Sequence, residues 1–92
     1  MRIMAIDYGD AHTGIAVSDP TGLLAGFTTV ITAYRPEAVA QRVAELAKEH
    51  GAEELVLGHP VNMDGSLGPR SEKAKAMQVL LAEATGLPVV LW

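Results

Sequence analysis

The stretch MRIMAIDYGDAHTGIAVSDP, residues 1–20, decides the fold, because its pattern predicts two strands joined by a tight turn. Residues 3–6 form a short continuous apolar run, which is typical of a central strand covered on both faces. Gly9 and Gly14 bracket a turn in which the backbone can adopt positive φ. Residues 14–17 then return as a second strand, so the chain is predicted to begin with a hairpin.

Asp7 follows the first apolar run directly and is the first candidate for a catalytic residue. A carboxylate at the end of an inner strand, beside a glycine turn that lets a phosphate or metal ion approach closely, is a recurrent active-site geometry. The other interpretation is structural, since an Asp that closes a strand can simply accept hydrogen bonds from the amides of the turn. The residues around Asp7 leave both interpretations open.

The remaining sequence predicts three more strands and two helices. They are a strand at residues 28–32, a helix at 36–50, a strand at 55–57, a helix that Pro69 opens and Gly86 ends, and a strand at 89–92. Short turns between the first three strands predict an antiparallel meander, and each helix between strands predicts a parallel return. We therefore expect an α/β fold with a mixed five-stranded sheet in the order βββαβαβ, forming one domain over residues 1–92.

Both predicted helices are amphipathic and have recognisable ends. Pro36 suits the first turn of the first helix, and Gly51 provides its left-handed stop. The apolar positions that we expect to face the sheet recur with helical spacing. They are Val39, Val43, Leu46 and Ala47 in the first helix and Ala74, Met77, Leu80, Leu81 and Ala84 in the second.

The composition excludes several classes of protein. Of the 92 residues, 49% are apolar, yet no window approaches the apolar length of a membrane span, and the start lacks the features of a secretory signal. We expect a cytoplasmic protein without a membrane partner. The absence of cysteine excludes a disulfide framework and thiolate sites. A net charge of −4 argues against binding nucleic acid through overall charge, although Arg70, Lys73 and Lys75 form a local basic cluster.

Three blocks of sequence resemble the YqgF family: DYGDAHTGIAVSDP at residues 7–20, GHPVNMDGSLGPR at 58–70 and TGLPVVLW at 85–92. The second block is similar to the family's Gly-Leu-Pro-Leu-Asn-Met-Asp-Gly loop, which leads into a helix. The resemblance covers essentially the whole chain. It implies a ribonuclease H-like fold and the activity of a metal-dependent endonuclease that matures the 5′ end of precursor 16S rRNA or resolves Holliday junctions.

The resemblance also implies a metal cofactor, Mg²⁺ or Mn²⁺, held by several converging carboxylates. In this fold class, two ions about 4 Å apart activate water and stabilise the leaving oxygen. Asp7 would be a metal ligand and a catalytic residue. The family's other acids follow the fifth strand, in an Asp-Glu-Arg segment and a final helix, and both lie beyond Trp92. We therefore expect a fold without its C-terminal helix and a chain with weak or no turnover.

Three residues are candidates for contacts with nucleic acid. His12 stands where the family usually has Arg, and it is the weaker phosphate ligand because it is mostly neutral at pH 7 and lacks a bidentate fork. Asn62, in the loop after the fourth strand, would either hydrogen-bond a phosphate or cap the loop. Arg70 would hold a phosphate at the start of the second helix or extend into solvent.

The sequence gives weaker support for a functional role of the other polar residues near the predicted site. Asp10, Asp19 and Asp64 lie in predicted turns, where a capping role is favoured over metal binding. His59 replaces a family Leu at the tip of the fourth strand. His50 precedes a helix stop, where a cation suits the helix dipole, and we assign it no site.

The expected partner is nucleic acid, either structured RNA or branched DNA. Two other functions stay open: a non-catalytic nucleic-acid-binding or assembly module, and a relative of actin-like ATPases, whose phosphate loop also uses an Asp-x-Gly turn. The second of these needs two large domains, which 92 residues cannot supply. Without a final helix, one sheet face and the strand ending at Trp92 would be exposed, so we expect homodimers or exchange of elements between chains.

Overall fold

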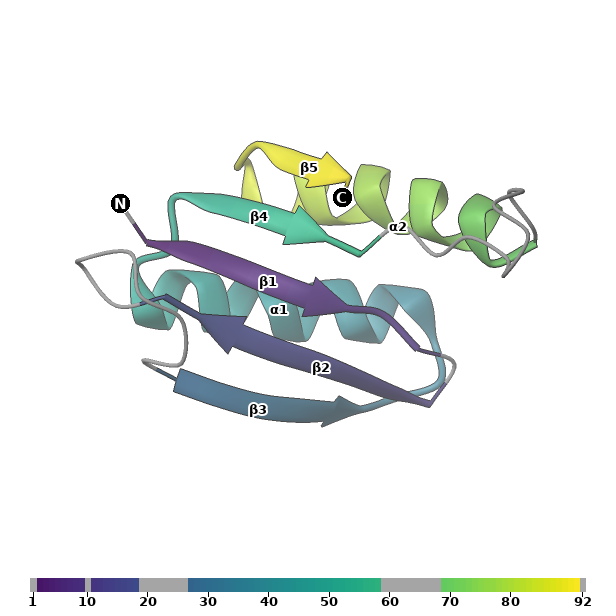
Figure 1. The fold of residues 1–92 in the computed structure, drawn as a ribbon, viewed down its shortest axis with the longest axis horizontal. Helices are drawn as coiled ribbons and strands as arrows, with labels where there is room; N and C mark the ends of the chain where they lie inside the picture. Colours follow the sequence, from purple (N-terminus) through teal and green to yellow (C-terminus); the bar gives the residue numbers. More distant parts are fainter. Residues whose placement is uncertain (1, 10, 19–26, 59–68, 92) are drawn as a thin grey trace.

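A computed structural model of the protein describes residues 2–9, 11–18, 27–58 and 69–91 as a five-stranded sheet with two helices (Figure 1). The strands are β1 (Ile3–Asp7), β2 (His12–Val17), β3 (Phe27–Thr32), β4 (Glu54–Leu57) and β5 (Val89–Leu91), and the helices are α1 (Pro36–His50) and α2 (Pro69–Thr85). The predicted α/β class and the order βββαβαβ are confirmed.

The strands lie in the order β3-β2-β1-β4-β5, which places β1 at the centre of the sheet. β1 pairs antiparallel with β2, and β2 pairs antiparallel with β3. On its other side β1 pairs parallel with β4, and β4 pairs parallel with β5. The predicted meander and the two parallel returns are therefore confirmed.

Both helices cover the same face of the sheet and lie against each other (Figure 1). The two crossovers, from β3 to β4 and from β4 to β5, both advance toward the β5 edge, and right-handed crossovers in one direction put their helices on one face. The strand residues that face the helices form the buried core together with apolar residues of α1 and α2. These strand residues include Met4, Ile6, Ile15, Val17, Ile31, Leu55 and Leu57.

The opposite sheet face, which we call the open face, carries the alternate residues of the strands. It comprises Ile3, Ala5 and Asp7 of β1, Gly14 and Ala16 of β2, Val30 of β3 and Val56 of β4. The prediction that β1 is covered on both faces was wrong for the described part of the chain, because α1 and α2 pack on the same side. Apart from Asp7 and Val30, which are exposed, these residues are half-buried.

Helix α1 begins and ends where its sequence signals predict. Pro36 occupies the first turn, and Gly51 follows the helix with φ 67°, in the left-handed region. The amide of Ala52 then donates a hydrogen bond to the carbonyl of Ala47 over 2.9 Å, which closes the last turn. All four predicted core positions of α1 are buried.

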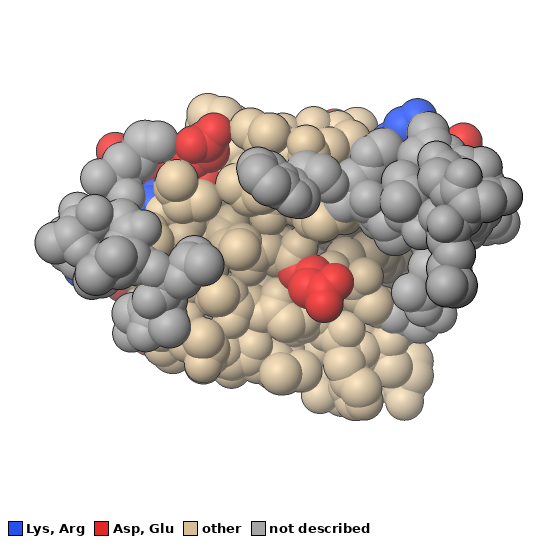
Figure 2. All heavy atoms as spheres, in the orientation of Figure 1, with Lys and Arg blue, Asp and Glu red and all other residues tan. Residues whose placement is uncertain are grey.

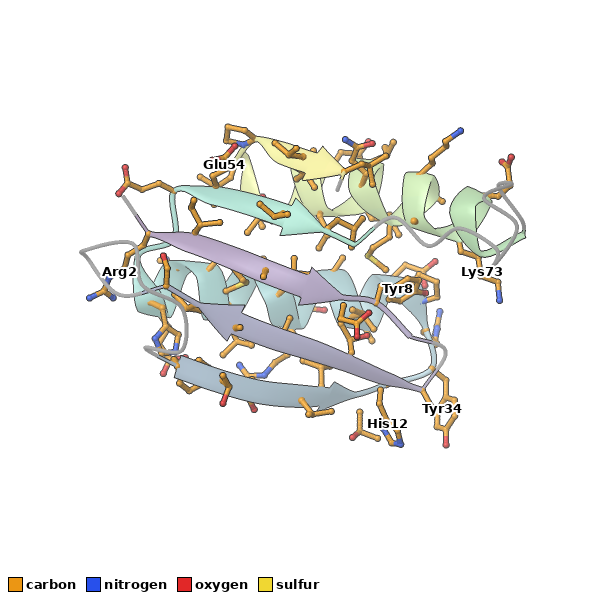
Figure 3. All side chains as sticks on the ribbon, in the orientation of Figure 1. Arg2, Tyr8, His12, Tyr34, Glu54 and Lys73 are labelled. Atoms are coloured by element: carbon orange, nitrogen blue, oxygen red, sulfur yellow. The ribbon has the colours of Figure 1, made fainter. Side chains whose placement is uncertain are left out.

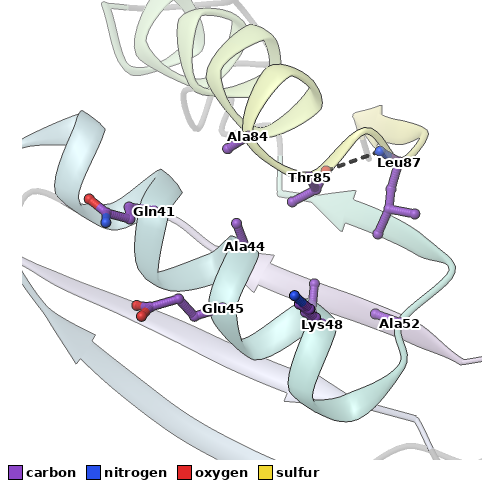
Figure 4. A pocket seen from close by; sticks show the side chains of 9 residues that line it. Gln41, Ala44, Glu45, Lys48, Ala52, Ala84, Thr85 and Leu87 are labelled. Atoms are coloured by element: carbon purple, nitrogen blue, oxygen red, sulfur yellow. Dashed lines mark hydrogen bonds between the residues drawn. The ribbon is translucent and has the colours of Figure 1, made fainter.

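Helix α2 ends at Thr85, and Gly86 follows with φ 70°. The Thr85 hydroxyl donates to the carbonyl of Leu81 over 2.7 Å and accepts from the amide of Leu87 over 3.1 Å (Figure 4). Of the predicted stripe, Ala74, Met77 and Leu81 are buried and Leu80 is partly buried. Ala84 was predicted wrongly, because it lines an open groove between α2 and α1 and is exposed there (Figure 4).

The remaining differences from the predicted elements are small. β2 begins two residues earlier than predicted, at His12, and β3 and β4 each begin one residue earlier, at Phe27 and Glu54. Phe27 stacks on the His50 ring, with centroids 4.1 Å apart, and the His50 carbonyl accepts a hydrogen bond from Nη1 of Arg2 over 2.7 Å. His50 therefore has structural contacts. No helix in the described part of the chain has the length and apolar run needed to cross a membrane.

Replacing Gly9 with Ala should destabilise the fold, because a Cβ at this position would collide with the backbone carbonyl of His12. We expect Gly9→Ala to lower the free energy of unfolding by about 1–3 kcal/mol in urea titrations followed by circular dichroism. Gly58→Ala is the matched control, since its Cβ would lie 3.6 Å from the Ile6 carbonyl oxygen, an ordinary contact. Equal losses in the two variants would contradict this account of the turn.

Thr13 is fully buried on the helix-covered face, and its hydroxyl has no hydrogen-bond partner in the described structure. An unpaired buried hydroxyl costs free energy, so the isosteric Thr13→Val change should raise the free energy of unfolding by about 1 kcal/mol. Thr13→Ser keeps the hydroxyl and removes a methyl group, and should lower the same quantity by about 1 kcal/mol. A destabilised Thr13→Val variant would show that the hydroxyl does find a partner.

Candidate functional site

Asp7 is the last residue of the central strand, and its side chain is exposed on the open face. Its partner across the antiparallel pair is Gly14 of β2, where a Cβ would lie 3.7 Å from the Asp7 Cβ. On the other side, the amide of Gly58 donates to the Ile6 carbonyl over 2.9 Å, directly beyond β4. The carboxylate is therefore flanked on both neighbouring strands by glycines, which leave room for a ligand to approach.

The Asp7 carboxylate takes part in no hydrogen bond and no ion pair within the described structure. A turn-capping role would require amide donors directed at this carboxylate, and the described residues provide none. Its geometry is that of an accessible anionic ligand at the centre of the sheet. Its catalytic and metal-binding roles remain predictions.

A shallow depression of about 650 Å³ extends over the open face and includes Asp7 at one end. Its lining is almost entirely apolar or backbone and includes Ile3, Ala5, Ala16 and Val56. Figure 2 shows this side of the molecule as a broad uncharged surface on which acidic side chains are few. Asp7 thus marks one end of a face that carries few charged side chains.

The described residues do not form a complete metal site. They contain no group of three or more His, Cys, Asp and Glu side chains arranged to hold an ion. Asp7 contributes one carboxylate. Glu54 lies at the other end of the open face, because it pairs with Ile3 at the start of β1. A two-ion nuclease centre needs several oxygen ligands, so Asp7 can be only part of one.

The other predicted site residues are placed only in part. His12 begins β2 at the same end of the sheet as Asp7 and is exposed (Figure 3). Arg70 lies in the first turn of α2, and its side chain is not among those described. Lys73 and Lys75 of the basic cluster lie on the exposed surface of α2. The remaining candidates lie outside the described residues: Asp10, Asp19, His59, Asn62 and Asp64.

A groove beside the Asp7 end of the sheet was missed by the sequence analysis. It has a volume of about 330 Å³ and is lined by Tyr8, Tyr34, Pro36, Lys73, Ala76 and Met77. One signal was present in the sequence, because both tyrosines follow the carboxyl ends of strands, Tyr8 after β1 and Tyr34 after β3. Since β1 and β3 run in the same direction, those ends meet at one edge of the sheet.

Comparison with known proteins identifies extensive similarity. The family model RuvX, described as Holliday junction resolvase, matches residues 1–92. A protein from Pelotomaculum thermopropionicum is 46% identical over 93 residues, covering 100% of this chain and 60% of the relative. A protein from Listeria monocytogenes serotype 4b is 44% identical over 94 residues, covering 100% of this chain and 68% of the relative. Both relatives carry the provisional name pre-16S rRNA nuclease.

Solved structures show the same fold. Thermus thermophilus RuvC in complex with a Holliday junction substrate superposes with a TM-score of 0.73 at 20% identity, covering 100% of this chain and 64% of RuvC. The ROK hexokinase from Thermus thermophilus gives a TM-score of 0.64 at 24% identity, covering 100% of this chain and 35% of the hexokinase. At these identities the likeness shows the ribonuclease H-like sheet and no shared activity.

The chain spans between 60% and 68% of the length of the curated relatives described above. The matched parts include Asp7, the glycine turn that follows it and both crossover helices, since the family match runs over residues 1–92.

Proposed function

The chain belongs to the RuvX family, described as Holliday junction resolvase, and on this premise we propose that it is a nuclease domain that cleaves structured nucleic acid in the cytoplasm. The observation that carries the proposal is Asp7, an exposed carboxylate without described partners at the end of the central strand, between Gly14 and the Gly58 backbone. The name of the relatives and the description of the family indicate two substrates, precursor 16S rRNA and the Holliday junction.

Cleavage is proposed to depend on a divalent cation, Mg²⁺ or Mn²⁺, with Asp7 as one ligand. A carboxylate facing a phosphodiester repels it unless a cation lies between them, which supports this dependence. Because the described residues supply one carboxylate, they do not fit a complete metal centre, and we assign no chemical step to the ion. Because the described residues provide a single metal ligand, we expect this chain to cleave its substrate slowly.

The nucleic-acid strand is proposed to reach Asp7 from the edge of the sheet where β1 ends and β2 begins. His12 is exposed at this edge, and the first turn of α2 brings Arg70 to the same end of the molecule. Unpaired amides at a helix start and nearby cationic side chains favour phosphate there. His12, Asn62 and Arg70 keep their proposed role as phosphate contacts.

A non-catalytic nucleic-acid-binding module is the second candidate function. One observation favours it: the absence of a carboxylate cluster around Asp7 among the described residues. Such a module would bind the same structured nucleic acid without cleaving it, so cleavage under enzyme excess separates the two candidates.

Replacing Asp7 with Asn should abolish cleavage without unfolding the protein, because the exposed side chain contributes no buried contact. We expect the single-turnover rate on precursor 16S rRNA fragments and four-way DNA junctions, with Mg²⁺ or Mn²⁺ and enzyme in excess, to fall about 100-fold or more. Chelation of the cation should have a similar effect. Glu54→Gln, at the far end of the same face, is the matched control and should cleave at the wild-type rate.

Two results would count against the nuclease proposal. If Asp7→Asn and Glu54→Gln cleave equally well, the cleavage comes from another site or from a contaminant. If the wild-type chain binds both substrates and cleaves neither, the binding module is the function.

Filling the space beside Asp7 should also impair cleavage while preserving the strand. Gly14→Val puts a branched side chain beside the Asp7 Cβ, and β-branched residues suit strands, so the melting temperature should not fall. We expect the cleavage rate to be at least about tenfold lower, because the added side chain blocks the approach of the substrate to the Asp7 carboxylate. Ala16→Val, the next residue of β2 on the open face, is the control and should leave the rate within about twofold. Equal rates in both variants would contradict a reaction centred on Asp7.

A further inference from the structure

The groove lined by Tyr8, Tyr34, Pro36, Lys73, Ala76 and Met77, here called the tyrosine groove, has features of a ligand subsite. It is formed by segments far apart in the sequence: the residue after β1, the segment from the end of β3 to the first residue of α1, and the N-terminal half of α2. Figure 3 shows Tyr8, Tyr34 and Lys73 gathered at the end of the molecule that also carries His12, opposite the end with Arg2 and Glu54.

The aromatic residues of the chain are distributed unevenly. The sequence contains two Tyr, one Phe and one Trp, and both tyrosines line this groove. Phe27 packs at the opposite end of β3, where it stacks on His50. The groove therefore combines two aromatic rings in a protein that has few.

Tyr34 is 79% exposed, more than any other large apolar or aromatic side chain among the described residues. A ring with this exposure adds little to the stability of the core. Tyr8 differs, because it is partly buried and packs against the core cluster. The groove thus has one ring held in place by the fold and one ring whose surface is available to a ligand.

The tyrosine groove is fixed relative to Asp7 by the backbone. Tyr8 follows Asp7 directly, and the amide of Ala33, the residue before Tyr34, donates to the Ala11 carbonyl over 3.0 Å. This hydrogen bond ties the segment that carries Tyr34 to the turn after β1. Tyr8 packs on the helix side of the sheet and Asp7 faces the open side, so a strand whose phosphate lies at Asp7 would have to pass round this end of the sheet to reach the two rings.

The charges beside the groove suit a polyanion, although the whole chain carries −4. Lys73 is part of the lining, and the exposed Arg35 follows Tyr34 directly at the start of α1. Glu37 and Glu72 lie in the first turns of the two helices but are not part of the groove lining. Aromatic rings interleaved with cationic side chains are typical of surfaces that bind single-stranded nucleic acid.

We propose that the tyrosine groove binds an unpaired nucleobase of a single-stranded segment next to the phosphate that is cleaved at Asp7. The base stacks on Tyr34 beside the fixed ring of Tyr8, and the cationic rim faces the backbone phosphates. This inference rests on the proposed nuclease function and refines its substrate: the preferred nucleic acid has an unpaired segment beside the cleavage point. Stacking does not read sequence, because every base offers a π-face.

Fluorescence anisotropy with three probes tests this subsite: a 12-nucleotide strand without self-complementarity, the same strand with abasic sites in place of its bases, and a fully paired hairpin. RNA and DNA versions are both used, and gels verify that each probe stays intact. We expect the wild-type chain to bind the base-bearing strand about tenfold more tightly than the abasic strand. Tyr34→Ala should lose this preference, and Tyr34→Phe should keep it within about twofold.

Val79→Ala is the matched control, because Val79 is another exposed side chain, 57% accessible, on α2 and outside the groove lining. Val79→Ala should bind all three probes with wild-type affinity. Tyr34→Ala should bind the fully paired hairpin with the same affinity as the wild type. Equal wild-type affinity for the base-bearing and abasic strands, or an unchanged preference in Tyr34→Ala, would overturn the subsite. If that happens while Asp7→Asn still abolishes cleavage, the nuclease proposal stands without the tyrosine groove.

Discussion

The pairing register of β1 is the constraint on which the rest of the structure depends. Ile6 pairs with Ile15 and Leu57, and these three side chains are buried beneath the helices. Because side chains alternate along a strand, Asp7 must then lie on the open face. A slip of one residue would turn Asp7 into the core and Ile6 into solvent, so burial of the apolar side chains of β1 also holds the carboxylate outward.

The same register brings the candidate binding elements to one edge of the sheet. It places Gly14 opposite Asp7. In the antiparallel meander β3 runs in the same direction as β1, so Tyr34, which follows β3, lies at the edge of the sheet where β1 ends. The right-handed crossovers put both helices on the far face, so no described helix covers the Asp7 side of the sheet.

The sequence was a good guide wherever several local signals agreed. The bounds of α1 were predicted to the residue, because the apolar spacing, Pro36 and Gly51 all indicate the same ends. The prediction failed where long-range geometry decides. A continuous apolar run does not show which strand face is covered. The positions of Tyr8 and Tyr34 after two strands suggest that they share one end of the sheet, but nothing in the sequence adds Lys73 of α2 to the same groove. The position of Asp7 at the end of the first strand could be predicted because its strand and turn are adjacent in sequence, whereas the loop at residues 59–68 lies outside the described structure.

Paramagnetic broadening by Mn²⁺ in amide NMR spectra tests the central claim most directly, because it locates a bound cation without requiring turnover. The account predicts that substoichiometric Mn²⁺ broadens the amide signals of Asp7, Gly14 and Gly58 first, since these residues surround the exposed carboxylate at the end of β1. Broadening that begins around Glu53 and Glu54, with the Asp7 signals unchanged, would contradict it. The outward carboxylate would then not be where the cation binds.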